Sequence, residues 1–231
     1  MRTHGLVRRL SGFFSIHFKL LRTNTLHLLP PRRQRKLLKA ILVHSSAIWN
    51  LGNSQKRQAL LQKSSIPAGF PLVKTLKPHP ISKVLGSAYS QQILNKLQEA
   101  WSAFFGALKS KKGAHQVGLP KYFKNRQTNQ TSPVLVFCRN DCYKLDKNSI
   151  FISCPTDLKQ NYHLKGLLRI KYNGILKWVR KQGKLEIQYF PVLKEFYAYQ
   201  SVKITPLPIK PNPTNISSGD IGIKRYLVNY I

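Results

Sequence analysis

Side chains that could carry out acid–base or metal chemistry are scarce in this sequence of 231 residues. Only seven are Asp or Glu, and all of them lie at or after Glu99. The three cysteines, Cys138, Cys142 and Cys154, form no Cys-x-x-Cys pair, so the sequence gives no support to a zinc ribbon. They lie in apolar, strand-like segments, and we expect buried free thiols in a reducing compartment.

Cationic side chains are abundant instead. The 39 Lys and Arg residues give a formal net charge of +32. A surface of one sign repels itself, so this chain needs a polyanion to neutralise it, and nucleic acid is the leading candidate. A basic structural RNA-binding protein of the ribosomal or nucleoid type shares this composition. Apolar residues make up 42% of the chain, which is enough for a core and argues against wholesale disorder.

Two basic clusters are candidate nucleic-acid-binding sites. The first, at the start of a predicted helix, comprises Arg32, Arg33, Arg35, Lys36 and Lys39. Cations there oppose the helix dipole, a cost that neighbouring phosphates would offset. The second comprises Lys121, Tyr122, Lys124 and Arg126, which suits phosphate contacts with one stacking ring. Asn50 is a further polar candidate, although such a residue more often satisfies a local helix end.

Two helices must position these residues. One is predicted to begin at Pro31, and apolar residues from Leu37 to Trp49 lie close to one stripe. The other, over 88–108, has aromatic and aliphatic residues at three- and four-residue spacings, which indicates core packing. Its polar face could meet a partner. The Pro- and Lys-rich residues 63–87 between them are predicted to be a loop or broken helix.

Short β-rich runs follow. Strands are predicted over 13–20, 134–138, 150–153, 164–172, 175–180, 184–190 and 195–204. Asn173-Gly174 predicts a hairpin, and 146–148 and Gln182-Gly183 predict further turns. The pattern favours an α+β fold, in which a small antiparallel β-barrel or sandwich carries the helices as an insertion. No apolar run reaches the length of a membrane span.

Four segments in this order resemble the TnpB family of transposon-encoded RNA-guided DNA nucleases (transposases of the OrfB type). They are residues 47–50 (AIWN), 100–105 (AWSAFF), 118–124 (GLPKYFK) and 219–222 (GDIG). The last resembles the first strand of a RuvC-like nuclease domain, one residue tighter than usual before its Asp. Each segment alone is weak, but their order across nearly the whole chain makes the resemblance fairly specific.

The resemblance implies a domain plan and partners. A wedge-like barrel would comprise 1–30 and 132–205, a helical recognition insertion 31–131, a linker 206–218, and the start of a RuvC-like domain 219–231. Guide RNA and target DNA would be the partners, in a prokaryotic cytoplasm near the nucleoid and without a membrane. Gln91 matches a family position that touches the target-adjacent motif.

The resemblance also bounds the chemistry. Asp220 matches a catalytic carboxylate, but such a site needs several carboxylates to hold its metal ions. We therefore expect a chain truncated before its active site is complete, inactive as a DNA endonuclease by itself. Mg²⁺ and zinc are expected only for a full-length family member. A complete nuclease with an unusual site is disfavoured by the seven acids.

Overall fold

A computed structural model describes residues 20–110, 118–125, 127–179 and 181–204. It combines one antiparallel sheet with five helices, as the predicted α+β class requires. The linker and RuvC-like segments, including Asp220, lie outside these residues, as does the predicted strand over 13–20 except for Leu20, the first residue of β1 (Leu20–Leu29). Among the described helices, none is both long and apolar enough to cross a bilayer.

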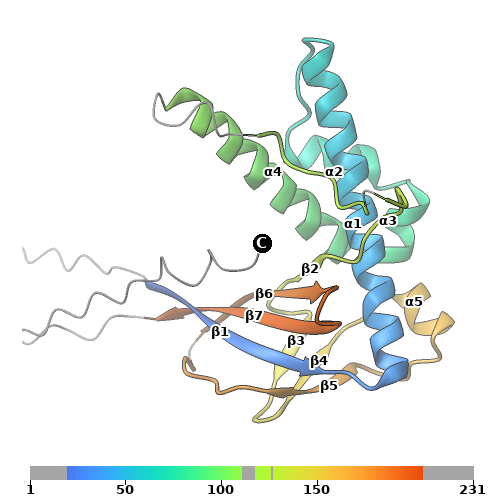
Figure 1. Ribbon diagram of the computed structural model, residues 1–231, viewed down its shortest axis with the longest axis vertical. Coiled ribbons are helices and arrows are strands. Elements are labelled where there is room, and N and C mark those ends of the chain that lie inside the picture. The colour runs from blue at the N-terminus through green and yellow to red at the C-terminus, as the bar shows by residue number, and fades with distance from the viewer. Residues whose placement is uncertain (1–19, 111–117, 126, 180, 205–231) are drawn as a thin grey trace, which may run out of the picture. The chain divides into compact units, whose positions relative to one another are not determined.

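The sheet has seven strands in the order β2-β6-β7-β1-β5-β4-β3. Their bounds are β1 Leu20–Leu29, β2 Leu135–Cys138, β3 Tyr143–Leu145, β4 Ser149–Ile152, β5 Leu168–Asn173, β6 Lys181–Phe190 and β7 Glu195–Ile204. β1, the first strand among the described residues, lies in the middle of the sheet. It pairs along its length with β7, from Leu20 opposite Ile204 to Leu28 opposite Phe196. Figure 1 shows the strands below α2, α3 and α4, with the start of α1 and α5 beside them.

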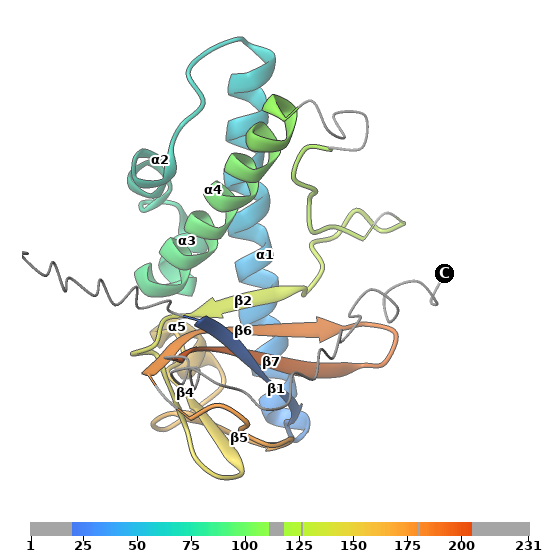
Figure 2. The ribbon, with the colours of Figure 1, turned by 90° about the vertical axis from the view of Figure 1, so that its left-hand side faces the viewer.

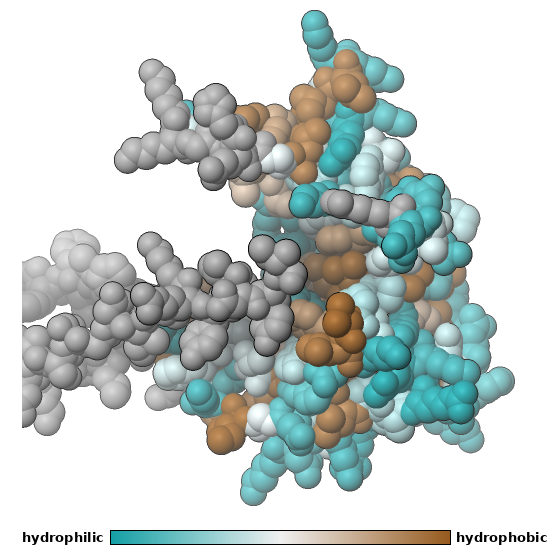
Figure 3. Space-filling view, viewed as in Figure 1, coloured by the Kyte–Doolittle hydropathy of each residue, from teal (hydrophilic) through white to brown (hydrophobic). Residues whose placement is uncertain are grey.

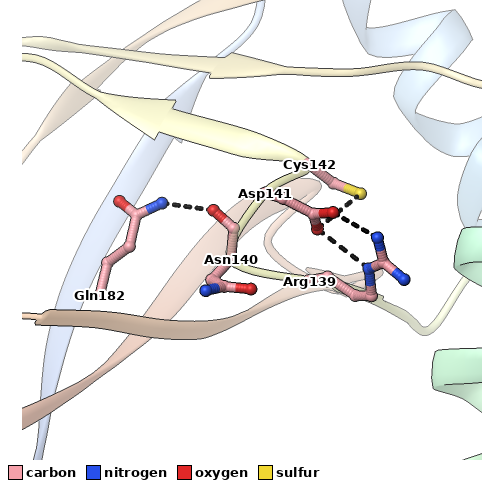
Figure 4. Close-up of polar contacts among 5 residues, drawn as sticks. All are labelled: Arg139, Asn140, Asp141, Cys142 and Gln182. Atoms are coloured by element: carbon pink, nitrogen blue, oxygen red, sulfur yellow. Dashed lines mark hydrogen bonds and ion pairs between the residues drawn. The ribbon is translucent and has the colours of Figure 1, made fainter.

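The backbone ladder does not close, so the predicted barrel is wrong. β2 and β3 form the two edges and are only 4 and 3 residues long, which leaves few groups for mutual pairing. Side chains join the region instead: Gln182 Nε2 donates to the carbonyl of Asn140 at 2.5 Å (Figure 4), and to that of Tyr143 at 3.2 Å. Gln182 lies at a β-bulge, where the predicted Gln182-Gly183 turn is also wrong.

The predicted strand over 175–180 is absent from the described residues 175–179, and Asn173-Gly174 forms no hairpin. The buried side chain of Asn24 explains the difference. Its Nδ2 donates to Trp178 O at 2.9 Å, and its Oδ1 accepts from Trp178 N at 3.1 Å. This one amide satisfies both backbone groups that a ladder would otherwise pair.

The helices are α1 Arg32–Leu61, α2 Gly69–Leu76, α3 Pro80–Leu85, α4 Ser87–Lys109 and α5 Thr156–Asn161. The two long helices confirm the predictions, including the start of α1 directly after Pro31. Residues 63–87, predicted as loop or broken helix, contain α2 and α3. Gly86 joins α3 to α4 with a φ of 80°, a conformation that favours glycine.

Helices α1 and α4 pack closely, as both views show (Figures 1 and 2). Gly52 on α1 permits this approach, because a Cβ there would lie 2.8 Å from Leu94 Cδ2 and 3.0 Å from Leu97 Cδ2 on α4. The first half of α1 buries Leu37, Leu38, Ile41 and Leu42 in the same core cluster as the sheet. The core thereby fixes α4 relative to the sheet. The division into domains at the boundaries given above stays a prediction.

Candidate nucleic-acid interface

One face of α1 holds an extended segment, residues 118–124, which we call the strap. Trp49 and Asn50 lie four and three residues before Asn53, and Arg57 lies four after it, so all four residues lie on one side of the helix. Asn53 Nδ2 and the Arg57 guanidinium both donate to Pro120 O, at 2.8 and 2.6 Å. Trp49 Nε1 donates to Lys121 O at 2.9 Å. These side chains satisfy backbone groups that no strand pairs.

Asn50 completes the attachment of the strap. Its Oδ1 accepts from Phe123 N at 2.7 Å, and its Nδ2 donates to Phe123 O at 3.2 Å. The ring of Phe123 stacks on Trp49 with centroids 4.8 Å apart. Asn50 is buried. The structure therefore gives this predicted nucleic-acid contact a supporting role, in which it orients the strap.

The strap brings part of the second basic cluster together. Lys121 and Lys124 are exposed, while Tyr122 is half-buried. Its ring lies between two cations, with the Arg57 guanidinium at 4.6 Å and the Lys124 ammonium at 5.9 Å from the centroid. Arg57 is a member that the sequence analysis missed, because it is 64 residues away from Lys121 in sequence but adjacent in space. Arg126 lies outside the described residues.

A second surface is a groove of about 600 Å³ between α2, α3 and the start of α4, which we call the basic groove. It is lined by Phe70, Val73, Lys74, Lys77, Ser82, Lys83, Gly86, Ser87, Ser90, Gln91 and Leu94. No acidic residue is among them. Gln91 is half-buried and Phe70 is 80% exposed. The groove thus combines three cations, one amide and an exposed ring.

Ser82 and Ser90 are the buried polar residues in the lining of this groove, and the hydroxyl of Ser82 differs in its bonding. It has no hydrogen-bond partner within the part of the chain that the structure describes. A ligand or water in the groove could satisfy it. The groove lysines were not predicted from the sequence because they lie in the segment predicted to be irregular. Their distance from any Asp or Glu in sequence was the pattern that could have identified them.

The cations in the first turns of α1 lie elsewhere, and none of them lines the basic groove. Arg32, Arg33, Arg35 and Lys36 are exposed, and the first turn has no acidic residue. Two of the five predicted members have partners among the residues that the structure describes. The Arg33 guanidinium donates to Tyr162 O at 3.0 Å, and the Lys39 ammonium lies 4.4 Å from the Tyr189 ring centroid.

A smaller hollow of about 180 Å³ lies between α4 and the sheet, and we call it the α4–sheet cleft. Figure 3 shows a hollow below α4 and above the strands. Glu99 bridges two of its lysines, with Oε2 3.0 Å from Lys96 Nζ and Oε1 3.6 Å from Lys184 Nζ. Burial acts to raise the pKa of Glu99, but its bonds and attraction to these ammonium groups outweigh burial and lower it.

The cysteine thiols are poorly suited to act as nucleophiles or metal ligands. Burial raises the pKa of Cys138 and of Cys154 to about 12, so both stay protonated at neutral pH. Cys142 is half-buried beside the ion pair between Arg139 and Asp141 (Figure 4). Within the described ranges, no three His, Cys, Asp or Glu side chains group to hold a metal ion.

Comparison with known proteins adds one relative. No family model matches the chain. Over 199 residues it is 28% identical to the TnpB-like protein ORF457 of Acidianus two-tailed virus. The chain is related to the TnpB family. The alignment covers 84% of this chain but only 41% of the viral protein, so the chain spans about two fifths of that relative's length.

The TnpB relationship gives the packed segments a common explanation. Three of the four segments that carry the resemblance meet around Asn53, whose Oδ1 accepts from Trp101 Nε1 at 3.0 Å while its Nδ2 binds the strap. They are residues 47–50, 100–105 and 118–124. Their resemblance therefore reflects, at least in part, the packing of α1, α4 and the strap. The fourth segment, with Asp220, lies outside the described residues.

Proposed function

We propose that this TnpB-family chain is a nucleic-acid-binding part of an RNA-guided DNA endonuclease, with guide RNA and target DNA as partners. The observation that carries the proposal is the basic groove, where three lysines surround Gln91 without a carboxylate. Phosphates attract lysines whatever the base sequence, whereas an amide can read the edge of a base. The groove offers both kinds of contact on one surface.

The strap supports the same function. Lys121 and Lys124 are exposed on a backbone that α1 holds by several hydrogen bonds, so their positions depend on a rigid element. A fixed cation loses less conformational entropy on binding a phosphate than one on a free loop. The exposed cations of α1, Arg32, Arg35 and Lys36, add a further phosphate-binding surface in this proposal.

We propose endonuclease activity for a full-length member of the family. The chain covers 41% of the viral relative, and the carboxylate expected to act in catalysis, Asp220, lies outside the described residues. In a full-length member, Mg²⁺ held by Asp220 and further carboxylates would activate water and stabilise the leaving oxygen. The wedge and recognition roles of the sheet and of the inserted helices, and a prokaryotic setting, are part of the same proposal.

A salt titration of binding tests it. The 231-residue chain is compared with a variant carrying Lys74→Gln, Lys77→Gln and Lys83→Gln, using RNA encoded at the end of the element that carries the gene. Each lost phosphate contact lowers the slope of log K against log salt by about 0.7 to 0.9. We expect a slope reduced by about two to three and an affinity lowered at least tenfold near physiological salt.

The matched control removes the same charge elsewhere. Lys144, Lys147 and Lys171 are exposed on or between β3, β4 and β5, and replacing them with Gln changes the net charge equally. Equal losses for both triple variants would contradict a specific role for the groove. Equal binding of unrelated RNA of the same length would favour the basic structural protein instead, and no binding of nucleic acid would overturn both functions.

A further inference from the structure

The floor of the α4–sheet cleft is a row of three side chains from neighbouring strands. In the sheet register Phe137 on β2 lies opposite Glu186 on β6, and Glu186 lies opposite Tyr199 on β7. All three line the cleft beneath α4. A carboxylate therefore stands between two aromatic rings on one face of the sheet, in reach of a small planar group that enters the cleft.

Glu186 is available in a way that Glu99 is not. Glu99 already bridges Lys96 and Lys184, whereas Glu186 has no cationic partner within 4.0 Å among the described residues. Its Oε1 accepts one bond, from Gln188 Nε2 at 2.5 Å. A carboxylate repels phosphate, so in a chain of +32 its place in a cleft suits a neutral ligand that donates hydrogen bonds.

The two aromatic rings, Phe137 and Tyr199, also differ in whether a partner already occupies the ring face. The Lys96 ammonium lies 5.7 Å from the centroid of Phe137 and occupies its face. Tyr199 is half-buried, and it stacks with no aromatic ring or cation in the described part of the chain. A base could stack on Tyr199 while its edge meets Glu186, which is the combination by which proteins hold unpaired bases.

We propose that the α4–sheet cleft binds one unpaired guanine base of a single-stranded nucleic acid, which Glu186 recognises and Tyr199 stacks upon. Guanine presents two adjacent N–H donors, its N1–H and its 2-amino group, to the two oxygens of one carboxylate. Adenine and cytosine present one amino group, and uracil one N–H. The inference rests on the proposed function, since it names a base within the nucleic acid that the chain binds.

Lys96 and Lys184 suit the flanking phosphates. Their side chains are 46% and 59% exposed, so a strand can reach both ammonium groups while the base enters the cleft. Glu99 holds both lysines and keeps them together before the strand binds. The cleft thus separates its tasks: the lysines contact the backbone at its rim, and Glu186 contacts the base on its floor.

Equilibrium binding of short labelled oligonucleotides tests the proposal with the full chain. The probes are a decamer of uridines, the same decamer with one central guanosine, and the same decamer with inosine, which lacks the 2-amino group. We expect guanosine to tighten binding about tenfold over uridine alone, and inosine to lose most of that gain. A decamer of thymidines with one central deoxyguanosine shows whether the site binds DNA as well as RNA.

Two variants separate recognition from charge. Glu186→Gln should abolish the guanosine preference yet bind oligouridine slightly more tightly, because a negative charge has gone. Glu195→Gln removes a carboxylate from the same sheet outside the cleft and should keep the preference. Tyr199→Ala should weaken binding of the guanosine decamer at least fivefold, while Tyr199→Phe should not. Circular dichroism and thermal unfolding establish that each variant is folded.

The outcomes distinguish the two proposals. If the wild-type chain binds all decamers equally, or if Glu186→Gln keeps the guanosine preference, the guanine site is wrong and the nucleic-acid function stands. If the wild-type chain binds neither the decamers nor longer RNA, both are wrong. A preference that is lost in Glu186→Gln and kept in Glu195→Gln supports the site.

Discussion

The basic groove and the α4–sheet cleft share one helix but differ in the charges that line them. The groove has three lysines and no acid, whereas the cleft has two lysines and two glutamates. Uncompensated cations attract any phosphate, so the groove is suited to binding nucleic acid tightly whatever its sequence. Balanced charges attract little by themselves, so the cleft is suited to selection among ligands by shape and hydrogen bonding. The sign and pairing of charges therefore distinguish two surfaces with similar side chains.

The largest effect on stability is expected from replacing Asn53. Its side chain binds Trp101 on α4, the helix that lines both the groove and the cleft. Asn53→Ala leaves Trp101 Nε1 without a partner and removes one of two donors to Pro120 O. Asn53 is fully buried, so the free energy of unfolding should fall by about 2 to 4 kcal/mol. Urea denaturation measures the loss.

The control for Asn53 is Asn95→Ala, an exposed position on α4 where the free energy of unfolding should change by less than about 0.5 kcal/mol. A loss of similar size in both variants would show that the buried amide is not what joins α1, α4 and the strap. Binding at the groove and at the cleft should weaken together in Asn53→Ala, since α4 contributes to both.

A sharper comparison uses two adjacent residues, because Gln91 lines the groove and Gln92 lines the cleft. Gln91→Ala should cost about 1 to 3 kcal/mol in discrimination between duplex DNA sequences and leave the guanosine preference intact. Gln92→Ala should leave duplex discrimination unchanged. A randomised duplex library measures the first property and the decamers the second. Loss of duplex selectivity in both variants would contradict the assignment of one surface to each residue.

The smallest effect is a dependence of stability on pH that involves neither surface. Lys56 is buried and donates to Pro67 O, at 2.5 Å, and to Gln98 Oε1 on α4, at 2.7 Å. Burial lowers the pKa of Lys56 below its ordinary value. Above that lowered pKa the folded chain has released a proton that the unfolded chain still holds, so the free energy of unfolding rises with pH until the ordinary value is reached.

Urea denaturation at a series of pH values between about 8 and 10 measures this dependence. The rise should be present in the wild-type chain and missing from Lys56→Met, and the difference between the two removes the contribution of the tyrosines. Identical pH profiles would contradict a lowered pKa for Lys56. Duplex and guanosine selectivity should be the same in Lys56→Met as in the wild-type chain.

Regular periodicity made α4 and β7 predictable from sequence, and β7 was predicted with its observed bounds. The barrel was wrong because the edge strands β2 and β3 are too short to pair, and the turn at Gln182-Gly183 was wrong because these residues lie at a bulge within β6. The hairpin at Asn173-Gly174 was wrong because the side chain of Asn24 binds the backbone of Trp178. Asn24 and Gln182 bind carbonyl groups far away in sequence, which no local pattern reveals. At the candidate sites, Lys121, Tyr122 and Lys124 were found as a cluster, but Arg57 and the groove lysines depend on tertiary packing.

The position of β1 bears on how the chain folds during synthesis. Helices α1 to α4 and the strap can assemble once residue 124 has left the ribosome, because α1, α4 and the strap contact one another. β1 is made before them, yet its principal partner is β7, with Leu20 opposite Ile204. Such distant pairing is slow to form. We therefore expect a folding intermediate with native α1 to α4 and an unpaired β1, which makes the basic groove and the strap available before the sheet exists.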